Sequence, residues 1–288
     1  MNDQAANLRH KMMKQSAQNH CKTIAVISGK GGVGKSNFSL NFSLTLSREQ
    51  KRVLLFDMDI GMGNIDILMG RTAERNIVDY FHHQMSLEEV ITEGPDHLRF
   101  ISGGSGLSHL FSMDNEKVDS FIAEFTVLQA HYDYLVFDLG AGISAETAKF
   151  LMCVDEIITI TTPEPTSIMD AYSIIKYLHM QNEDLPFNVV CNRASNEREG
   201  RETINRLKKT VKQFLGKEIV TLGILPDSKA VSKAVLRQVP FTTHNAHSDI
   251  SKSMKQLTIG FLERDNIKGA KESQRTFLDK FKLFFTGK

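Results

Sequence analysis

The chain of 288 residues is poor in features that define several common classes of protein. Its only cysteines are Cys21, Cys153 and Cys191, which lie far apart and form no CxxC pair. This spacing argues against a disulfide framework, a zinc ribbon and a cluster-carrying CxxC site. No segment approaches the roughly 18 consecutive apolar residues that a membrane-spanning helix needs. The polar residues 1–20 lack the apolar core of a secretory signal, so we expect a cytoplasmic protein.

The chain also has no excess of charge of either sign. It contains 35 Lys and Arg residues against 34 Asp and Glu residues, which gives a formal net charge of +1. No attraction to nucleic acid or anionic lipid therefore acts on the whole chain, and such a partner has to meet a local patch. Hydrophobic residues make up 41% and charged residues 24%, which argues for a globular fold rather than disorder.

Short apolar runs alternate with longer amphipathic stretches along the chain. Most of the runs lack polar alternation, which predicts strands that are covered on both faces. The predicted strands are 23–28, 53–57, 98–102, 134–138, 156–161, 187–192 and 219–225, and the predicted helices are 36–47, 116–131, 166–180 and 197–215. Repeated strand–helix units predict an α/β fold with a mostly parallel sheet and helices on both faces. We expect three parts: an N-terminal arm (1–22), one domain (23–262) and a C-terminal amphipathic helix (263–288).

The strongest functional signal is the sequence GKGGVGKS at residues 29–36. It satisfies the pattern GxxxxGK[ST] and stands between a predicted strand and a predicted helix. The glycines let backbone N–H groups close around phosphates, and the helix adds its positive end. Lys35 can reach phosphate oxygens, and the Ser36 hydroxyl can bind Mg²⁺. The predicted nucleotide-binding residues are Gly29, Lys30, Gly31, Gly32, Val33, Gly34, Lys35, Ser36 and Asn37.

The loop contains a further lysine, Lys30, at its second position. The sequence KGGVGKS resembles the deviant phosphate loop of the MinD/ParA family of ATPases. The resemblance implies a P-loop NTPase fold of the MinD/ParA type that hydrolyses ATP to ADP and phosphate. In that family the early lysine reaches the phosphates of the partner subunit. Lys30 therefore implies an ATP-dependent homodimer and joins Lys35 as a predicted catalytic residue.

Carboxylates stand at the ends of two predicted strands. Asp57 and Asp59 lie at the end of strand 53–57, and Asp138 ends strand 134–138. The carboxyl ends of parallel strands face the ligand crevice of such a sheet. By resemblance, Asp59 positions the attacking water, while Asp57 supports it and the surroundings of the metal. Ser36, Asp57 and Asp138 are the predicted Mg²⁺ residues, since Mg²⁺ takes one or two carboxylates and keeps several waters.

The predicted strand 187–192 points to the base that the site accepts. It leads into Asn192 and Arg193 without the NKxD aspartate that reads guanine in translational GTPases. An asparagine can pair with the N6/N7 edge of adenine. The resemblance implies that Asn192 meets the base and that Pro226 and Asp227 line its pocket. The predicted ligands are ATP or ADP with Mg²⁺.

Positive charge is concentrated in residues 264–288, where seven basic and three acidic residues give a net charge of +4. An apolar stripe on one helical face there consists of Phe277, Leu278, Phe281, Phe284 and Phe285. The pattern fits a helix in a lipid interface, and it equally fits a stripe that packs on the domain as core. The MinD resemblance favours the first, and implies reversible attachment to anionic lipid on the inner face of the cell membrane.

The sequence DQAANLR at residues 3–9 resembles the activating arm of FlhG-type proteins, which are MinD-like ATPases that control flagellar number and placement. The resemblance implies that the arm stimulates an FlhF-like GTPase of the signal-recognition-particle type, with Gln4 acting in the partner's catalytic site. Flagellar basal-body components are further implied partners. The residues by themselves favour a terminus without a role.

Other functions share the same phosphate loop. A ParA-type DNA-segregation ATPase needs a basic surface, for which the predicted helix 197–215 offers Arg201, Arg206, Lys208, Lys209 and Lys212. So many charges on one helix are usually a solvated face, and DNA is not an expected partner. A MinD-type division-site ATPase and an adaptor that nucleotide merely gates stay open.

Overall fold

The computed structural model describes residues 21–59, 64–83, 85–103, 115–268 and 276–286. Within them, eight strands form one sheet in the order β3-β4-β2-β5-β1-β6-β7-β8. All neighbouring strands are parallel except β3 and β4. The strands are β1 (Lys22–Ile27), β2 (Val53–Met58), β3 (Thr92–Glu93), β4 (Arg99–Ile101), β5 (Tyr134–Leu139), β6 (Glu156–Thr161), β7 (Phe187–Ala194) and β8 (Val220–Pro226). The predicted mostly parallel sheet is confirmed.

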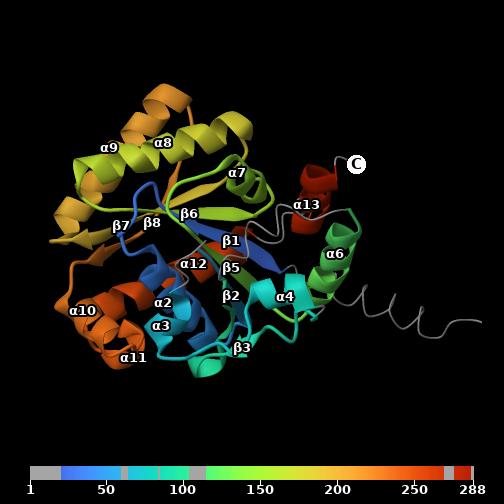
Figure 1. Cartoon of the computed structure of the whole chain (residues 1–288). Coiled ribbons are helices and arrows are strands. Elements are labelled where there is room, and N and C mark those ends of the chain that lie inside the picture. Colours follow the sequence, from blue (N-terminus) through green and yellow to red (C-terminus); the bar gives the residue numbers. More distant parts are fainter. Residues whose placement is uncertain (1–20, 60–63, 84, 104–114, 269–275, 287–288) are drawn as a thin grey trace, which may run out of the picture.

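Helices cover both faces of the sheet (Figure 1). One face carries α4 (Ile77–His83), α6 (Asn115–Gln129), α7 (Ala145–Leu151), α8 (Pro165–Gln181), α9 (Glu197–Leu215) and α13 (Phe277–Thr286). The opposite face carries α2 (Lys35–Arg48), α3 (Ile65–Met69), α10 (Lys229–Leu236), α11 (Phe241–His244) and α12 (Asp249–Lys268). A short 3₁₀ turn, η1 (Pro95–His97), joins β3 to β4.

The two-sided cover explains the unbroken apolar runs of the sequence. Along β5, Leu135 and Phe137 belong to the hydrophobic cluster of one face, and Tyr134 and Val136 belong to that of the other. Because successive side chains of a strand point to opposite faces, a strand with two buried faces needs apolar residues at nearly every position. Every residue of β5 is accordingly buried.

The predicted elements agree with the structure where they were named, but some were missed. The helix 197–215 and the strand 156–161 coincide with α9 and β6. The two-residue strand β3 and the helices α10 and α12 had no predicted counterpart. The expected domain boundary after residue 262 falls inside α12, which continues to Lys268. The arm at residues 1–20 lies outside the described part of the chain.

Two further predictions from the sequence are that the cysteines form no disulfide framework and that no helix spans a membrane. Cys21, Cys153 and Cys191 are all buried free thiols. Among the residues that the structure describes, no helix is long and apolar enough to cross a membrane.

Candidate nucleotide site

The phosphate loop connects β1 to α2 and is packed tightly at two of its glycines. A Cβ atom on Gly29 would lie 2.4 Å from the backbone of Asp170 at α8. Gly34, which caps α2, has a φ of +90°, and a Cβ there would lie 2.4 Å from Asn192 Nδ2. Both positions exclude a side chain, because the loop is pressed between two neighbouring elements. The N-terminus of α2 begins directly after Gly34, where it can bind an anion.

Asn192, the predicted base-binding residue, holds this loop in place. It lies at the end of β7, and its Nδ2 donates to the backbone oxygen of Val33 over 2.8 Å. Its Oδ1 accepts from the N–H of Arg193 over 3.0 Å. Arg193 has a φ of +56°, a strained backbone for a residue other than glycine.

Lys35 and Asp138 form a buried ion pair beside the loop. The Lys35 Nζ atom lies 2.9 Å from Asp138 Oδ1 and 3.4 Å from the Ser36 hydroxyl. Asp138 is fully buried, and its other oxygen, Oδ2, has no hydrogen-bond partner within the described residues. A buried charge is tolerated only when it is paired, so Lys35 neutralises Asp138 here. The sequence alone could not show this pair, because its members are 103 residues apart.

Asp57 lies beside Asp138 in the sheet. The two residues are register partners on β2 and β5. The Asp57 carboxyl accepts from the N–H groups of Asp59 and Ile65 over 3.1 and 3.2 Å. Burial, and secondarily the charge of Asp138, raises the pKa of Asp57 to about 7. The predicted metal-binding carboxylates are therefore side by side, and Asp57 loses its proton only near neutral pH.

Asp59 stands at the mouth of the same site. It is half-buried, and burial raises the pKa of its carboxyl while the Lys35 charge opposes that rise. Its Oδ1 lies 3.0 Å from where a Cβ on Gly140 would be, so it borders the loop that follows β5. A carboxylate with a raised pKa at this position is suited to accept a proton from water.

The oxygen atoms around Lys35 fit a hydrated Mg²⁺ ion. The orphaned Asp138 Oδ2, the Asp57 carboxyl and the Ser36 hydroxyl are oxygen donors, which Mg²⁺ prefers. No cluster of three or more His, Cys, Asp or Glu residues that could hold a metal occurs in the described residues. One or two carboxylates are the usual number for Mg²⁺ beside phosphates.

Lys30 lies exposed on the loop and pairs with a carboxylate at the edge of the nucleotide site. Its Nζ is 2.8 Å from Glu164 Oε2, just before α8. The hydrogen bond to Glu164 raises the pKa of Lys30 and lowers that of the carboxyl. Both side chains are exposed, by 45% and 59%, so this pair can open at little cost.

A cavity of about 460 Å³ adjoins the loop and is large enough for a base. Six predicted residues line it, namely Gly34, Asn37, Asn192, Arg193, Pro226 and Asp227. The sequence analysis missed Phe38, Glu164, Leu225, Ser228, Val231, Ser232, Phe241 and Ile250. Most of these come from β8, α10, α11 and α12. Phe241 and Ile250 belong to helices that carried no motif, so only the packing of the fold could have found them.

The predicted membrane residues are divided between the core and the surface. Phe277, Leu278 and Phe281 are buried, whereas Phe284 is 41% exposed. The side chain of Phe285 and the whole of Gln4 lie outside the described residues. Of the two readings left open by the sequence, core packing holds for the three buried residues in this structure, and lipid contact stays a prediction.

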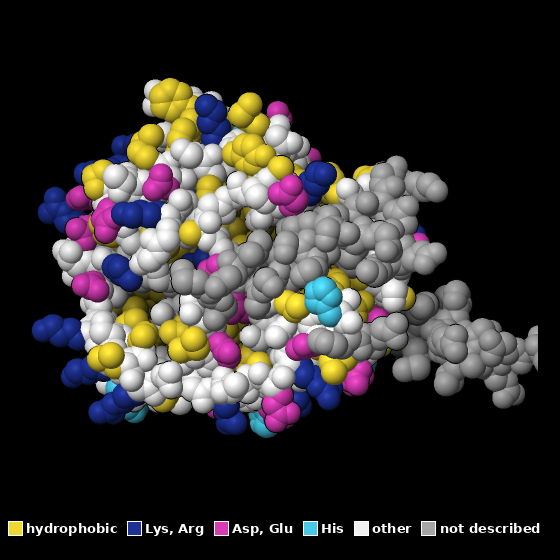
Figure 2. Space-filling model, in the orientation of Figure 1, with side chains coloured by type: hydrophobic (Ala, Val, Ile, Leu, Met, Phe, Trp, Pro, Cys, Tyr) yellow, Lys and Arg dark blue, Asp and Glu magenta, His cyan; other side chains and the backbone are white. Residues whose placement is uncertain are grey.

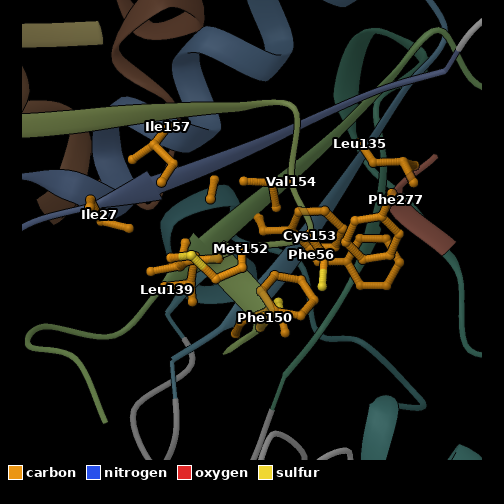
Figure 3. Close-up of a cluster of buried hydrophobic side chains, with 14 of the residues drawn as sticks. Ile27, Phe56, Leu135, Leu139, Phe150, Met152, Cys153, Val154, Ile157 and Phe277 are labelled. Atoms are coloured by element: carbon orange, nitrogen blue, oxygen red, sulfur yellow. The ribbon is translucent and has the colours of Figure 1, made fainter. Parts of the chain in front are cut away.

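The buried part of α13 sits in an aromatic groove. The Phe277 ring lies 5.3, 5.8 and 5.6 Å from the rings of Phe125, Phe137 and Phe150. Phe281 lies 5.5 Å from Phe121 of α6. Figure 3 shows Phe277 in the same buried cluster as Phe56, Cys153 and Phe150. Burial raises the pKa of the Cys153 thiol to about 12, so this thiol is unreactive here.

Comparison with known proteins identifies the family. The model of the CobQ/CobB/MinD/ParA nucleotide-binding domain matches residues 24–241. The chain is 35% identical to the antiactivator FleN of Pseudomonas aeruginosa over 78% of this chain and 81% of FleN. It is 35% identical to the flagellum site-determining protein YlxH of Helicobacter pylori over 96% and 97% of the two chains.

Solved structures give the same fold. MinD of Pyrococcus horikoshii, complexed with Mg-ADP, matches with a TM-score of 0.69 at 20% identity, over 88% of this chain and 99% of that one. The domain match over most of the chain, the two relatives at 35% identity and the phosphate loop agree with one another. The chain therefore belongs to the MinD/ParA family of nucleotide-binding ATPases, in its FlhG-type branch.

Proposed function

We propose that this ATPase is a dimerising switch that regulates the number and placement of flagella. The relatives FleN and YlxH carry the names antiactivator and flagellum site-determining protein, and YlxH matches along nearly the whole chain. The proposal also keeps the three parts expected from the sequence: the arm (1–22), the ATPase domain (23–262) and the C-terminal segment (263–288). Each part would have a different partner.

Hydrolysis needs groups that bind phosphate and orient water. Lys35 would leave Asp138 and bind the β and γ phosphate oxygens, since its charge is already in reach of the loop. Asp59 would orient the attacking water and accept its proton. Ser36, Asp57 and Asp138 would hold Mg²⁺, which when bound neutralises charge on the phosphate oxygens.

The exposed position of Lys30 is the main structural support for the proposed dimer. Its ammonium lies at the outer surface of the loop and has an exposed carboxylate, Glu164, as its partner. A second copy facing this surface would bring a triphosphate close enough to compete with Glu164 for the lysine. The triphosphate carries more negative charge, so Lys30 would exchange partners and join the two copies. ADP lacks the γ-phosphate, so the pair would separate after hydrolysis.

Attachment to the membrane would use α13. In the structure its apolar face lies in the aromatic groove, so release exposes both the helix and the groove. Burying one phenylalanine contributes about 2 kcal/mol, and lipid can replace that contribution for the helix. A single short helix binds weakly, and a dimer with two helices gains by avidity.

Strand β5 lies between the two sites and is a candidate for their coupling. Asp138 faces the nucleotide site, and its neighbour Phe137 contacts Phe277 of α13 on the opposite face of the sheet. Phe150, another neighbour of Phe277, lies on α7, directly after the loop that contains Gly140 and Gly142. A change in this loop on ATP binding would therefore disturb the groove.

The thiol of Cys153 provides a direct test of release. In a variant with Cys21 and Cys191 changed to alanine, ATP and anionic vesicles should speed labelling of Cys153 by a thiol reagent. ADP should not. Binding to the vesicles in flotation should follow the same dependence on nucleotide. Labelling that stays slow while the protein floats with the vesicles would show that α13 remains docked.

The arm would act on an FlhF-like GTPase through Gln4, since a glutamine can orient an attacking water. The peptide covering residues 1–18 should speed GTP hydrolysis by such a protein, and the same peptide with Gln4→Ala should not. Equal stimulation by the two peptides would remove Gln4 from the proposal.

The flagellar role is tested in the organism that carries the protein. Loss of the gene should change the number or position of flagella seen by electron microscopy. The wild-type gene should restore the pattern, and Lys30→Ala should not. Restoration by Lys30→Ala would contradict the switch.

The DNA-binding alternative loses support in the structure. On α9, Arg201 pairs with Glu197 and Arg198 pairs with Glu202, while Lys212 pairs with Glu218 after the helix. Figure 2 shows basic and acidic side chains interspersed at the upper left margin, where α9 lies. These pairs compensate three of the six basic residues of α9, so the surface is partly neutralised and its attraction for DNA phosphates is reduced.

A further inference from the structure

Ser39 lies on α2, one turn after Lys35 and beyond the phosphate-loop motif. Its side chain is fully buried. Its hydroxyl donates to Asp138 Oδ1 over 2.7 Å, the same oxygen that accepts from Lys35 Nζ over 2.9 Å. Asp138 Oδ2 is buried and has no partner within the described residues. One oxygen of the carboxylate is thus held by two donors, and the other is left for a ligand.

The two donors differ in what a nucleotide would do to them. Lys35 has to leave Asp138 when a polyphosphate enters, because its ammonium is the group that binds the phosphates. The Ser39 hydroxyl is enclosed within the fold, and the other acceptor in its reach is the backbone oxygen of Lys35, at 3.1 Å. Ser39 is therefore the donor that stays with Asp138 in the nucleotide-bound protein.

We infer that Ser39 is a positioning residue that fixes the Asp138 carboxylate while nucleotide is bound. Without a donor on Oδ1 the carboxylate can turn about its last bond, and Oδ2 is no longer held ready for a hydrated Mg²⁺ ion. Removing a side chain that orients a metal's ligand typically lowers metal affinity by about 10- to 100-fold. The inference rests on the binding of Mg²⁺ with nucleotide, which belongs to the proposed function.

Ser43 provides a matched control for Ser39. It lies one further turn along α2 and is also fully buried, but its hydroxyl has no partner within the described residues. Ser43→Ala removes the same atom from the same helix without removing a hydrogen bond to Asp138. Any difference between the two alanine variants therefore reports on the bond to Asp138.

The test measures the thermal unfolding of the full chain with ADP, first in EDTA and then with increasing Mg²⁺. Ser39→Ala should keep the wild-type rise in Tm with ADP in EDTA. The Mg²⁺ concentration for half of the additional rise should increase by about tenfold or more. Ser43→Ala should behave as wild type, and Ser39→Thr should restore the response to Mg²⁺. Ser39→Cys, which keeps a weak donor in a somewhat larger side chain, should show a smaller loss than Ser39→Ala.

Three results would overturn the inference. The first is an unchanged Mg²⁺ dependence in Ser39→Ala and Ser39→Cys. The second is a loss of the Mg²⁺ response in Ser43→Ala equal to that in Ser39→Ala. The third is a loss of the ADP response in EDTA in Ser39→Ala, which would make Ser39 a structural part of the loop. If the Tm of the wild-type protein rises with ADP but not with added Mg²⁺, both the proposed Mg²⁺ site and the inference about Ser39 are refuted. One that does not respond to ADP at all would refute the proposed function itself.

Discussion

The phosphate end of the sheet and the groove that holds α13 are both deeply buried, but different forces hold them together. At the phosphate end, the Lys35–Asp138 ion pair and the neighbouring Asp57 place charges inside the fold. In the groove, Phe277 and Phe281 are surrounded by aromatic rings. A buried charge exchanges its partner for another charge, and an apolar face exchanges its cover for lipid. The two regions are thus suited to two kinds of ligand.

The first and largest expected effect concerns Asp59 at the charged region. Asp59→Ala removes the group that would accept the proton of the attacking water, so we expect kcat to fall by at least about 100-fold. Binding of ATP should change little, because the phosphate loop and Lys35 are kept. Steady-state phosphate release and ATP titration measure the two quantities. A kcat within threefold of wild type would contradict the role of Asp59.

The second prediction concerns the aromatic groove. Phe281→Ala removes a fully buried ring and should lower the free energy of unfolding by about 3 kcal/mol, measured in urea. Phe121→Ala removes a ring of the groove and leaves the apolar face of α13 intact, so it should allow binding to anionic vesicles without ATP because α13 is held less firmly. Phe284→Ala, at an exposed position on the same helix, should cost less than about 1 kcal/mol and weaken vesicle binding with ATP.

The comparison of Phe281→Ala with Phe284→Ala tests whether one residue of α13 is buried and the other exposed. Equal losses of stability would contradict the division of α13 into a buried and an exposed face. Vesicle binding that depends on ATP as strictly in Phe121→Ala as in wild type would contradict release from the groove.

The third prediction uses the pKa of Asp57, which burial raises from 3.8 to about 7. Between about pH 4 and 7 the folded protein keeps a proton that the unfolded chain has lost. The free energy of unfolding therefore falls as the pH rises through this interval, and above pH 7 the fold contains an additional buried charge. Relative to wild type, Asp57→Asn should be more stable at pH 8 than at pH 5 by on the order of 2–3 kcal/mol.

Urea unfolding at the two pH values measures this difference, and the exposed Asp184 is the control position. Asp184→Asn should give the same difference from wild type at both pH values. A gain for Asp57→Asn that does not depend on pH would show that Asp57 does not take up a proton in the fold.

The smallest effect is expected at the exposed pair of the charged region. Glu164→Gln removes the carboxylate that holds Lys30, so the dimer with ATP should become about two- to fivefold tighter. Sedimentation of protein saturated with ATP measures this, with ATP affinity determined separately because Glu164 also lines the base cavity. Glu197→Gln, which breaks an exposed pair with Arg201, should change nothing. A weaker dimer in Glu164→Gln would contradict the exchange of partners.

The sequence predicts the charged region well because its chemistry is local. One continuous segment with a known sequence motif contains the glycines, Lys35 and Ser36. The ends of two parallel strands bring Asp57 and Asp138 to the same edge of the sheet. The base pocket was found only in part, since Phe241 comes from a helix of four residues without a motif. The pairing of Lys30 with Glu164 spans 134 residues and leaves no local signal.

The aromatic region is harder to predict for a physical reason. A period of 3.6 residues shows that Phe277, Leu278, Phe281 and Phe284 share one helical face, but not what covers that face. Lipid and a groove of phenylalanines are both apolar, so the same stripe suits either. The groove itself is built from β2, β5, α6 and α7, which only the fold brings together.

The proposed switch requires two copies to close around their triphosphates, with Lys30 of each copy at the phosphates of the other. Light scattering of Asp59→Ala with saturating ATP and Mg²⁺ tests this most directly, because hydrolysis no longer empties the site. We expect a mass near twice 32.4 kDa with ATP. With ADP, or when Lys30→Ala is added to Asp59→Ala, we expect a mass near 32.4 kDa. A single-chain mass with ATP bound, or a dimer that forms equally well without Lys30, would contradict the proposed switch.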